Sequence, residues 1–134
     1  MLTLIHPPLH PVPHPTYSPD EVIRIQLRAL QHNDHPGSNS GIAVAFGFAS
    51  PANRVVTGPL MRFMFLVHDT LYAPLLNFQC VDYAPIVVDG NFAQQVVRVV
   101  GQHGESAAYV FGLSRQENDP FSGCWMTDSV LRIE

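Results

Sequence analysis

The second half of the chain consists of four strand-like segments that are joined only by short turns. These segments are rich in Val, Ile, Phe and Tyr, and they cover residues 81 to 88, 92 to 100, 106 to 116 and 123 to 133. Asp89-Gly90, His103-Gly104 and Asn118-Asp119-Pro120 separate them, and each is a turn signal. Because such short connections join antiparallel neighbours, the sequence predicts a four-stranded antiparallel sheet.

A helix is predicted to begin just after a sixteen-residue arm. Ser18 and Glu21 have the spacing of a capping box, and Pro19 suits the first helical position. The turn signals of residues 33 to 37 end the helix. Its expected buried face consists of Val22, Ile23, Gln26, Leu27 and Leu30.

Two further helices are predicted before the strands. Residues 41 to 49 are too uniformly apolar for an exposed helix, and Gly47 indicates close packing against a neighbour. Ser50-Pro51 ends this helix and starts a short helical turn, after which the helix of residues 60 to 68 begins behind Thr57-Gly58-Pro59. Residues 72 to 76 then lead the chain from the helices into the sheet.

Helices followed by antiparallel strands predict an α+β fold. We expect three N-terminal helices packed on one face of a curved, four-stranded sheet, which together form a cone with one open end. Residues 1 to 16 are predicted to be a proline- and histidine-rich arm, and residues 17 to 134 the cone domain. His6, His10 and His14 recur every four residues, but the five prolines among residues 7 to 15 exclude the helix that would align them.

Composition excludes several classes of function. The chain has 134 residues, a net charge of −4 and only 13% charged residues, so it has no basic surface for nucleic acid. All seven basic residues are arginine, which excludes a Schiff-base or phosphate-loop lysine. Cys80 and Cys124 lack the spacing of a zinc or redox site. No phosphate loop, nucleophile elbow or metalloprotease motif occurs, and we expect neither a metal nor a cofactor.

No segment has the length of a secretory core or a membrane helix, so we expect a soluble protein with no membrane partner. The two cysteines favour a reducing compartment over a disulfide framework. A cytoplasmic location is the corresponding expectation.

Strand alternation sorts the polar candidates onto two faces of the sheet. In the preferred register, Gln95, Tyr109, Arg115 and Trp125 face the helices. Arg98 and Asp128 then lie on the outer face as a cross-strand ion pair. A slip of one residue would exchange the two faces, because side chains alternate with period two.

The inward-facing polar residues are expected to meet His68 and Tyr72 from the helical side. His68, Tyr72 and Arg115 are the catalytic candidates, with His68 as general base and Tyr72 or Arg115 stabilising an oxyanion. Arg54, Gln95, Tyr109 and Trp125 are the ligand-binding candidates. Each also has a structural interpretation, and for Arg54 this is hydrogen bonding to nearby carbonyls or pairing with a carboxylate.

Several motifs resemble a known family. ALQHND, AFGFASPANR, TGPLMRF, YAPLL and RQ followed by GCWMTD are similar to a family catalogued as a domain of unknown function within the nuclear-transport-factor-2-like superfamily, also called cystatin-like or ketosteroid-isomerase-like. The resemblance covers residues 18 to 134. It implies the cone fold and a homodimer built on the outer sheet face, but the catalytic arrangements of the known enzymes have no position-by-position match here.

Three classes of function therefore stay open. The first is a small-molecule-binding protein that holds an apolar or amphipathic ligand in the cone. The second is a cofactor-free enzyme, an isomerase, cyclase or hydrolase that uses acid–base chemistry. The third is a dimeric interaction scaffold without a ligand, whose cone is filled by its own side chains.

Overall fold

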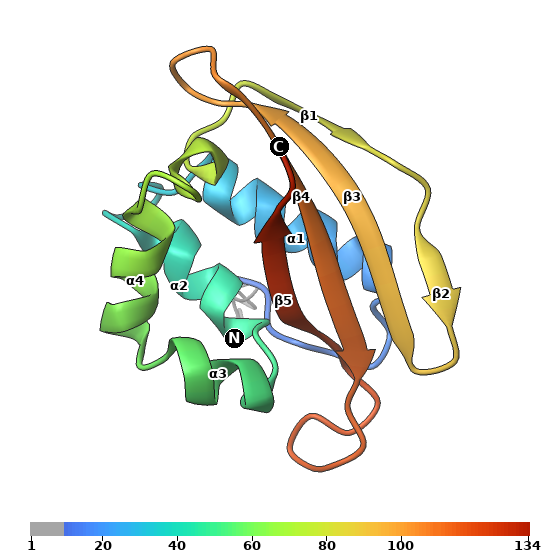
Figure 1. Ribbon diagram of the computed structural model, residues 1–134. Coiled ribbons are helices and arrows are strands. Elements are labelled where there is room, and N and C mark those ends of the chain that lie inside the picture. The colour runs from blue at the N-terminus through green and yellow to red at the C-terminus, as the bar shows by residue number, and fades with distance from the viewer. Residues whose placement is uncertain (1–9) are drawn as a thin grey trace, which may run out of the picture.

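The computed structural model describes residues 10–134, and its helices come first along the chain (Figure 1). Four α-helices are followed by one turn of 3-10 helix. They are α1 (Pro19–Gln31), α2 (Ser40–Gly47), α3 (Pro51–Thr57), α4 (Leu60–His68) and η1 (Ala73–Leu75).

Five strands follow and pair in antiparallel fashion into one open sheet. They are β1 (Cys80–Tyr83), β2 (Val87–Asp89), β3 (Phe92–Val100), β4 (Ser106–Arg115) and β5 (Trp125–Arg132). The order across the sheet is β1-β3-β4-β5, and β2 also pairs with β3.

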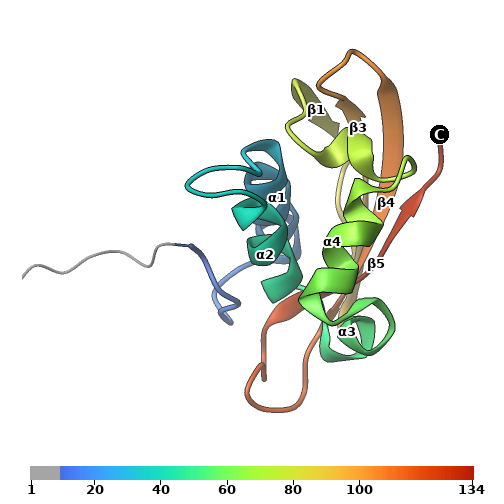
Figure 2. The same cartoon turned by 90° about the vertical axis from the view of Figure 1, so that its left-hand side faces the viewer.

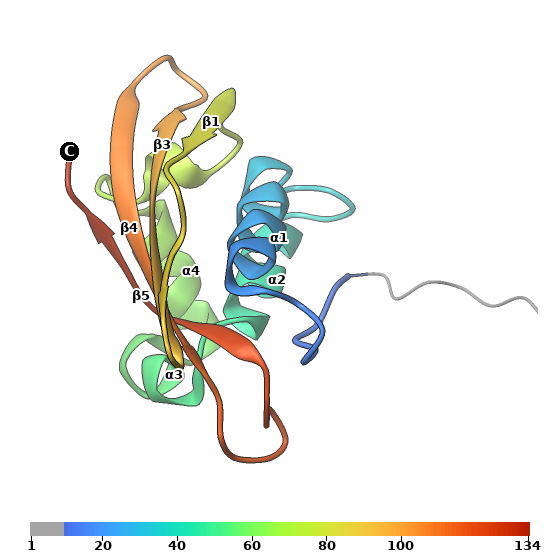
Figure 3. The ribbon, with the colours of Figure 1, turned by 90° about the vertical axis from the view of Figure 1, so that its right-hand side faces the viewer.

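The helices are distributed unevenly around the sheet. Figures 2 and 3 show α1 and α2 stacked on one face of it, whereas α3 and α4 lie beside the edge formed by β5. At that edge, Ser50 N donates to Thr127 O and Thr127 N donates to Phe48 O, both at 2.8 Å. The short link between α2 and α3 is thereby attached to β5.

The first helix follows the sequence expectation closely. Ser18 Oγ accepts from Glu21 N, and Glu21 Oε1 accepts from Ser18 N at 3.0 Å, so the capping box is complete. The predicted inward positions are all buried, and they are Val22, Ile23, Gln26, Leu27 and Leu30.

The preferred strand register is also confirmed. The buried positions alternate along the two central strands, and they include Gln95, Val97 and Val99 in β3 and Tyr109, Phe111 and Leu113 in β4. These side chains form the core against α1 and α2. Since alternation fixes both faces together, Arg98 points to the outer face, as expected.

The α+β class is confirmed, but the detailed arrangement differs from the prediction of three helices and four strands forming a cone. The expected helical turn after Ser50 extends to the seven residues of α3, because Ser50 Oγ accepts from Asn53 N and Pro51 occupies the first turn. The expected first strand is divided into β1 and β2 around Pro85, which has no N–H to donate to a ladder. The resulting five-stranded sheet is not closed.

The predicted ion pair of Arg98 with Asp128 is wrong, because Arg98 pairs with Glu134 instead. Arg98 lies opposite Ala108, whose backbone is bonded to that of Ile133, so the end of the chain passes beside Arg98. Asp128 falls at the register shift between β4 and β5, near the start of the last strand and six residues before Glu134. The Arg98–Glu134 pair is exposed, and such pairs contribute little to stability.

Within residues 10–134, no helix has the length and apolar character needed to cross a membrane.

Candidate functional site

Two of the seven predicted site residues, Tyr72 and Tyr109, lie together. Their rings stack with centroids 5.9 Å apart. Tyr109 donates from its hydroxyl to Leu71 O at 2.6 Å, and Tyr72 donates to Val130 O at 2.9 Å. Burial raises the pKa of Tyr109 to about 12. Both phenols are therefore engaged with backbone carbonyls, and Tyr109 stays protonated near neutral pH.

His68 lies at the end of α4 and is exposed. Its Nε2 is 2.9 Å from Asn39 Oδ1, and that oxygen also accepts from Asn33 Nδ2 at 2.9 Å. His68 thus belongs to a polar cluster that joins the end of α4 to the start of α2, where Asn39 adopts a left-handed conformation.

Arg115 and Trp125 are cross-strand partners near the other end of the sheet. Arg115 follows Tyr109 by six positions on β4, which corresponds to about 20 Å along a strand. Arg115 is exposed, and Trp125 packs at the margin of the core. Tyr72 and Arg115 are consequently separated by most of the length of β4, so the three catalytic candidates do not form one site.

The remaining two candidates, Gln95 and Arg54, also donate hydrogen bonds to backbone carbonyls. Gln95 is buried on the inner face and donates from Nε2 to Ala84 O at 2.7 Å. Arg54 donates from Nε to Ala49 O at 3.0 Å and from Nη2 to Gly47 O at 2.7 Å. Its partial burial lowers the pKa of the guanidinium. The structural interpretation of Arg54, hydrogen bonding to nearby carbonyls, therefore agrees with its geometry.

The space between α1, α2 and the sheet is filled by the side chains of the protein itself. The largest side chains that are almost wholly removed from solvent include Tyr109, Phe48, Phe111, Ile23 and Leu27. None of the seven candidates lines the main pocket of the described residues or the smaller one at the β1 edge.

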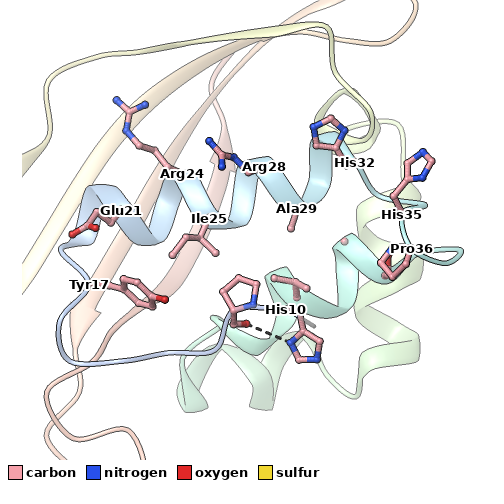
Figure 4. Close-up of a pocket in the computed structure, with 14 residues that line it drawn as sticks. His10, Tyr17, Glu21, Arg24, Ile25, Arg28, Ala29, His32, His35 and Pro36 are labelled. Atoms are coloured by element: carbon pink, nitrogen blue, oxygen red, sulfur yellow. Dashed lines mark hydrogen bonds between the residues drawn. The ribbon is translucent and has the colours of Figure 1, made fainter. Parts of the chain in front are cut away.

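The main pocket lies on the opposite side of the helical layer, facing away from the sheet. This α1–α2 groove has a volume of about 770 Å³ and extends between the two helices and the end of the N-terminal arm (Figure 4). Its wall is mainly apolar, and it includes Pro11, Tyr17, Ile25, Ala29, Gly41 and Val44. A volume of this size is typical of small-molecule sites.

The floor of the groove exists because α1 and α2 approach each other closely. A Cβ atom placed on Gly41 would overlap the carbonyl oxygen of Ala29. Gly41 N donates to Asn33 O at 2.9 Å, which fixes the start of α2 against the end of α1. The helices therefore touch at this point, and Val44 and Ile25 line the groove beyond it.

Two arginines and a histidine border the groove at α1 and its C-cap. Arg24, Arg28 and His32 are spaced four residues apart, and Figure 4 shows all three rising on the side of α1 away from α2. The guanidinium of Arg24 lies 4.0 Å from the ring centroid of Tyr83. Arg28 donates no side-chain hydrogen bond to any residue from 10 to 134.

The one carboxylate that lines the groove is already occupied. Glu21 Oε1 accepts from the backbone N–H and from the hydroxyl of Ser18, and these bonds lower the pKa of the carboxyl group. His10 and His35 contribute imidazole groups near the rim. The groove therefore combines an apolar wall with a cationic border, an arrangement suited to an amphipathic anion.

Sequence reasoning did not identify the groove. The spacing of Arg24, Arg28 and His32 is visible in the sequence, with Ile25 and Ala29 one position further on, but it is also the ordinary pattern of a solvated helix face. What makes the groove is the contact of Gly41 with α1, which joins segments that are separate in the sequence.

Residues 10 to 134 contain no group of three or more His, Cys, Asp or Glu side chains that could hold a metal ion. His10 and His14 of the arm are therefore not part of such a group within these residues. His6 lies outside the described residues. His14 Nδ1 is 2.8 Å from the hydroxyl of Thr16.

Comparison with known proteins gives one match. The family model described as "Domain of unknown function (DUF4864)" matches residues 18–132. No curated protein and no solved structure matches the chain.

Proposed function

The chain belongs to the DUF4864 family, whose description names no activity, and we propose from the geometry of the α1–α2 groove that the protein binds a small amphipathic anion. The observation that carries the proposal is the position of two arginines, Arg24 and Arg28, on the border of a mainly apolar groove. This retains the small-molecule-binding class expected from the sequence and moves the ligand from the interior of the fold to the outer side of the helices.

The apolar part of the ligand would lie between Ile25 and Ala29 on one side and Val44 on the other. Each Å² of apolar surface removed from water there contributes about 25 cal/mol. The anionic group would reach Arg28, whose planar guanidinium can donate two parallel hydrogen bonds to a carboxylate. A medium-chain carboxylate such as dodecanoate has both features.

The pair of arginines itself supports an anionic ligand. Like charges four residues apart on a helix destabilise it by a few tenths of a kcal/mol, and a bound anion relieves this repulsion. Arg24 is held over the ring of Tyr83, whereas Arg28 donates no side-chain hydrogen bond within the described part of the chain. Arg28 is accordingly the main anion-binding residue of the proposal.

Two finer assignments belong to the same proposal. The packing of α1 and α2 on one face of an antiparallel sheet supports membership of the nuclear-transport-factor-2-like superfamily. Two free cysteines, Cys80 and Cys124, support a cytoplasmic location, because reducing compartments keep thiols unpaired.

Isothermal titration with dodecanoate tests the function. We expect saturable binding that Arg28→Gln weakens about tenfold, corresponding to the loss of one charge-assisted contact. Arg115→Gln is the matched control, because Arg115 is an exposed arginine outside the groove. Weaker binding in Arg115→Gln with unchanged binding in Arg28→Gln would overturn the assignment to the groove.

A second pair of variants tests the apolar wall. Val44→Glu places a carboxylate in the groove and should abolish dodecanoate binding, whereas Val87→Glu alters an exposed valine of β2 and should leave it intact. Dodecyltrimethylammonium has the same tail with a cationic head, and we expect it to bind more weakly than dodecanoate. Equal affinity for the two ligands would show that the arginines do not select the anion.

A further inference from the structure

The two helices beside the β5 edge expose an unusual amount of apolar surface. Val55 is 85% exposed, Phe65 73%, Val56 67% and Met61 64%. With Leu60 and Leu66, which are also exposed, these side chains make up the α3–α4 surface. The two helices are in contact, and they lie next to each other in Figures 1 and 2.

Helix α4 is apolar on both of its sides. Phe63, Met64 and Val67 pack toward the core, and the ring of Phe63 lies 5.0 Å from that of Phe46. Met61 and Phe65 lie on the opposite side of the helix, where they face solvent. Apart from Arg62 and His68, every residue of α4 is apolar. A helix that is apolar on both sides is normally buried, so α4 has nearly the composition of a helix covered on both sides.

The size of this surface matches an interface. Six exposed side chains of this kind present on the order of 600 Å² of apolar surface, which is the upper end for the largest patch of a monomer. A standard interface buries about 800 Å² on each partner. The exposed apolar area of the α3–α4 surface therefore approaches what one side of a stable interface requires.

The charges around Phe65 indicate which partner fits. Arg62 precedes Phe65 by three positions and lies on the outward side of α4. Asp69 follows Phe65 by four positions as the C-cap residue of α4, where its Oδ1 accepts from Leu71 N at 3.1 Å. Arg62 makes no ion pair or side-chain hydrogen bond with residues 10 to 134. If two copies of α4 cross in antiparallel fashion at Phe65, Arg62 of each copy lies near Asp69 of the other.

The family resemblance implies a homodimer through the outer sheet face; we propose instead that the α3–α4 surface binds a second copy of this chain, with the two α4 helices antiparallel about a two-fold axis near Phe65. Such a contact is self-complementary, because the same apolar surface and the same opposite charges occur on both sides. A lipid surface fits less well, since the surface has one arginine and no lysine and the chain carries a net charge of −4.

Sedimentation over a concentration series tests the proposal. The full chain should sediment as a dimer, and Phe65→Asp should raise the dissociation constant about 30-fold or more, as expected for a central apolar residue of an interface. Phe92→Asp is the matched control: Phe92 is 66% exposed but lies on β3, on the outer face of the sheet. This variant should leave the dimer intact.

A charge exchange tests the orientation of the helices. Arg62→Asp alone should weaken the dimer, and the combination with Asp69→Arg should restore it, because the two charges change places across the axis. Thermal melting of each variant at low concentration shows whether the monomer still folds. A chain that stays monomeric up to its solubility limit overturns the proposal, as does a dimer disrupted by Phe92→Asp and not by Phe65→Asp.

Discussion

Tyr72 and Tyr109 form a reciprocal clasp between the helical layer and the sheet. Their rings stack at 27° between planes, and each hydroxyl donates to a carbonyl on the other side of the clasp. Tyr109 of β4 binds Leu71 O, which immediately precedes Tyr72, while Tyr72 binds Val130 O of β5. Tyr72, a catalytic candidate, and Tyr109, a ligand-binding candidate, thus connect the chain after α4 to the sheet.

This clasp predicts a coupled effect on stability. Tyr109→Phe and Tyr72→Phe should each lower the free energy of unfolding by about 1 kcal/mol, the usual contribution of one hydrogen bond. Because the rings are in contact, the double variant should depart from additivity by about 0.5 kcal/mol or more. Urea denaturation of the four proteins measures the coupling, and strictly additive values would show that the two bonds act independently.

The raised pKa of Tyr109 predicts a loss of stability in alkali. The unfolded side chain ionises near its ordinary value of 10.0, while the folded one keeps its proton up to about 12. Between these values the unfolded state binds fewer protons, so the free energy of unfolding falls as pH rises. The melting temperature of Tyr109→Phe should therefore fall less steeply than that of the wild type from about pH 10 upward. Parallel curves would contradict the assignment.

A buried hydrogen-bond chain across the core gives a third prediction. Thr127 Oγ1 donates to Gln26 Oε1 at 2.6 Å, and Gln26 Nε2 donates to Ala45 O at 3.1 Å, so β5, α1 and α2 are joined. Thr127→Val keeps the shape but leaves Gln26 Oε1 without this donor, and should cost about 1 to 3 kcal/mol. The exposed Thr70→Val should change the free energy of unfolding by less than about 0.5 kcal/mol. Equal effects of the two substitutions would show that the buried hydrogen bonds of Thr127 and Gln26 add nothing to the free energy of unfolding.

The contact between α1 and α2 predicts opposite results for two glycines of the same helix. Gly41→Ala forces a methyl group onto the backbone of Ala29 and Asn33, and should cost about 2 to 3 kcal/mol. Gly47→Ala meets no atom within 4 Å, and should be neutral or stabilising by up to about 1 kcal/mol. Thermal denaturation compares them, and a well-tolerated Gly41→Ala would show that the helices can separate.

The same two glycines show what sequence can and cannot predict. Gly47 was expected to pack closely against a neighbour, yet the close contact occurs at Gly41. Helix composition shows that a glycine is present, but which glycine meets another helix depends on where the two helices cross. That crossing is set by contacts such as Gly41 N with Asn33 O, between segments on either side of a turn.

Local patterns predicted the fold well wherever neighbours in the sequence decide the structure. The capping box of Ser18 and Glu21 involves residues three apart. Strand alternation groups Gln95 with Val97 and Tyr109 with Phe111, and the apolar residues of each group turn it toward the core. The division of the first strand was not predicted, although Pro85 has no N–H to donate to a ladder.

The candidate site could not be predicted in the same way. Strand alternation predicts that Tyr109 and Arg115 lie on the same face of β4. Two residues on one face need not be close to each other, and these two are six positions apart along the strand. The expectation of a ligand in the interior also assumed empty space, whereas Phe48 and Phe111 fill it. The groove lies outside the helices, where Arg24 and Arg28 resemble an ordinary solvated face.

The central claim is that a ligand binds in the α1–α2 groove, and an amide NMR titration of the ¹⁵N-labelled chain with dodecanoate tests it most directly. We predict that the shift changes are concentrated at Ile25, Ala29, Gly41 and Val44, which line the groove. Shift changes concentrated at Gln95, Tyr109 and Trp125, on the inner face of the sheet, would contradict the claim.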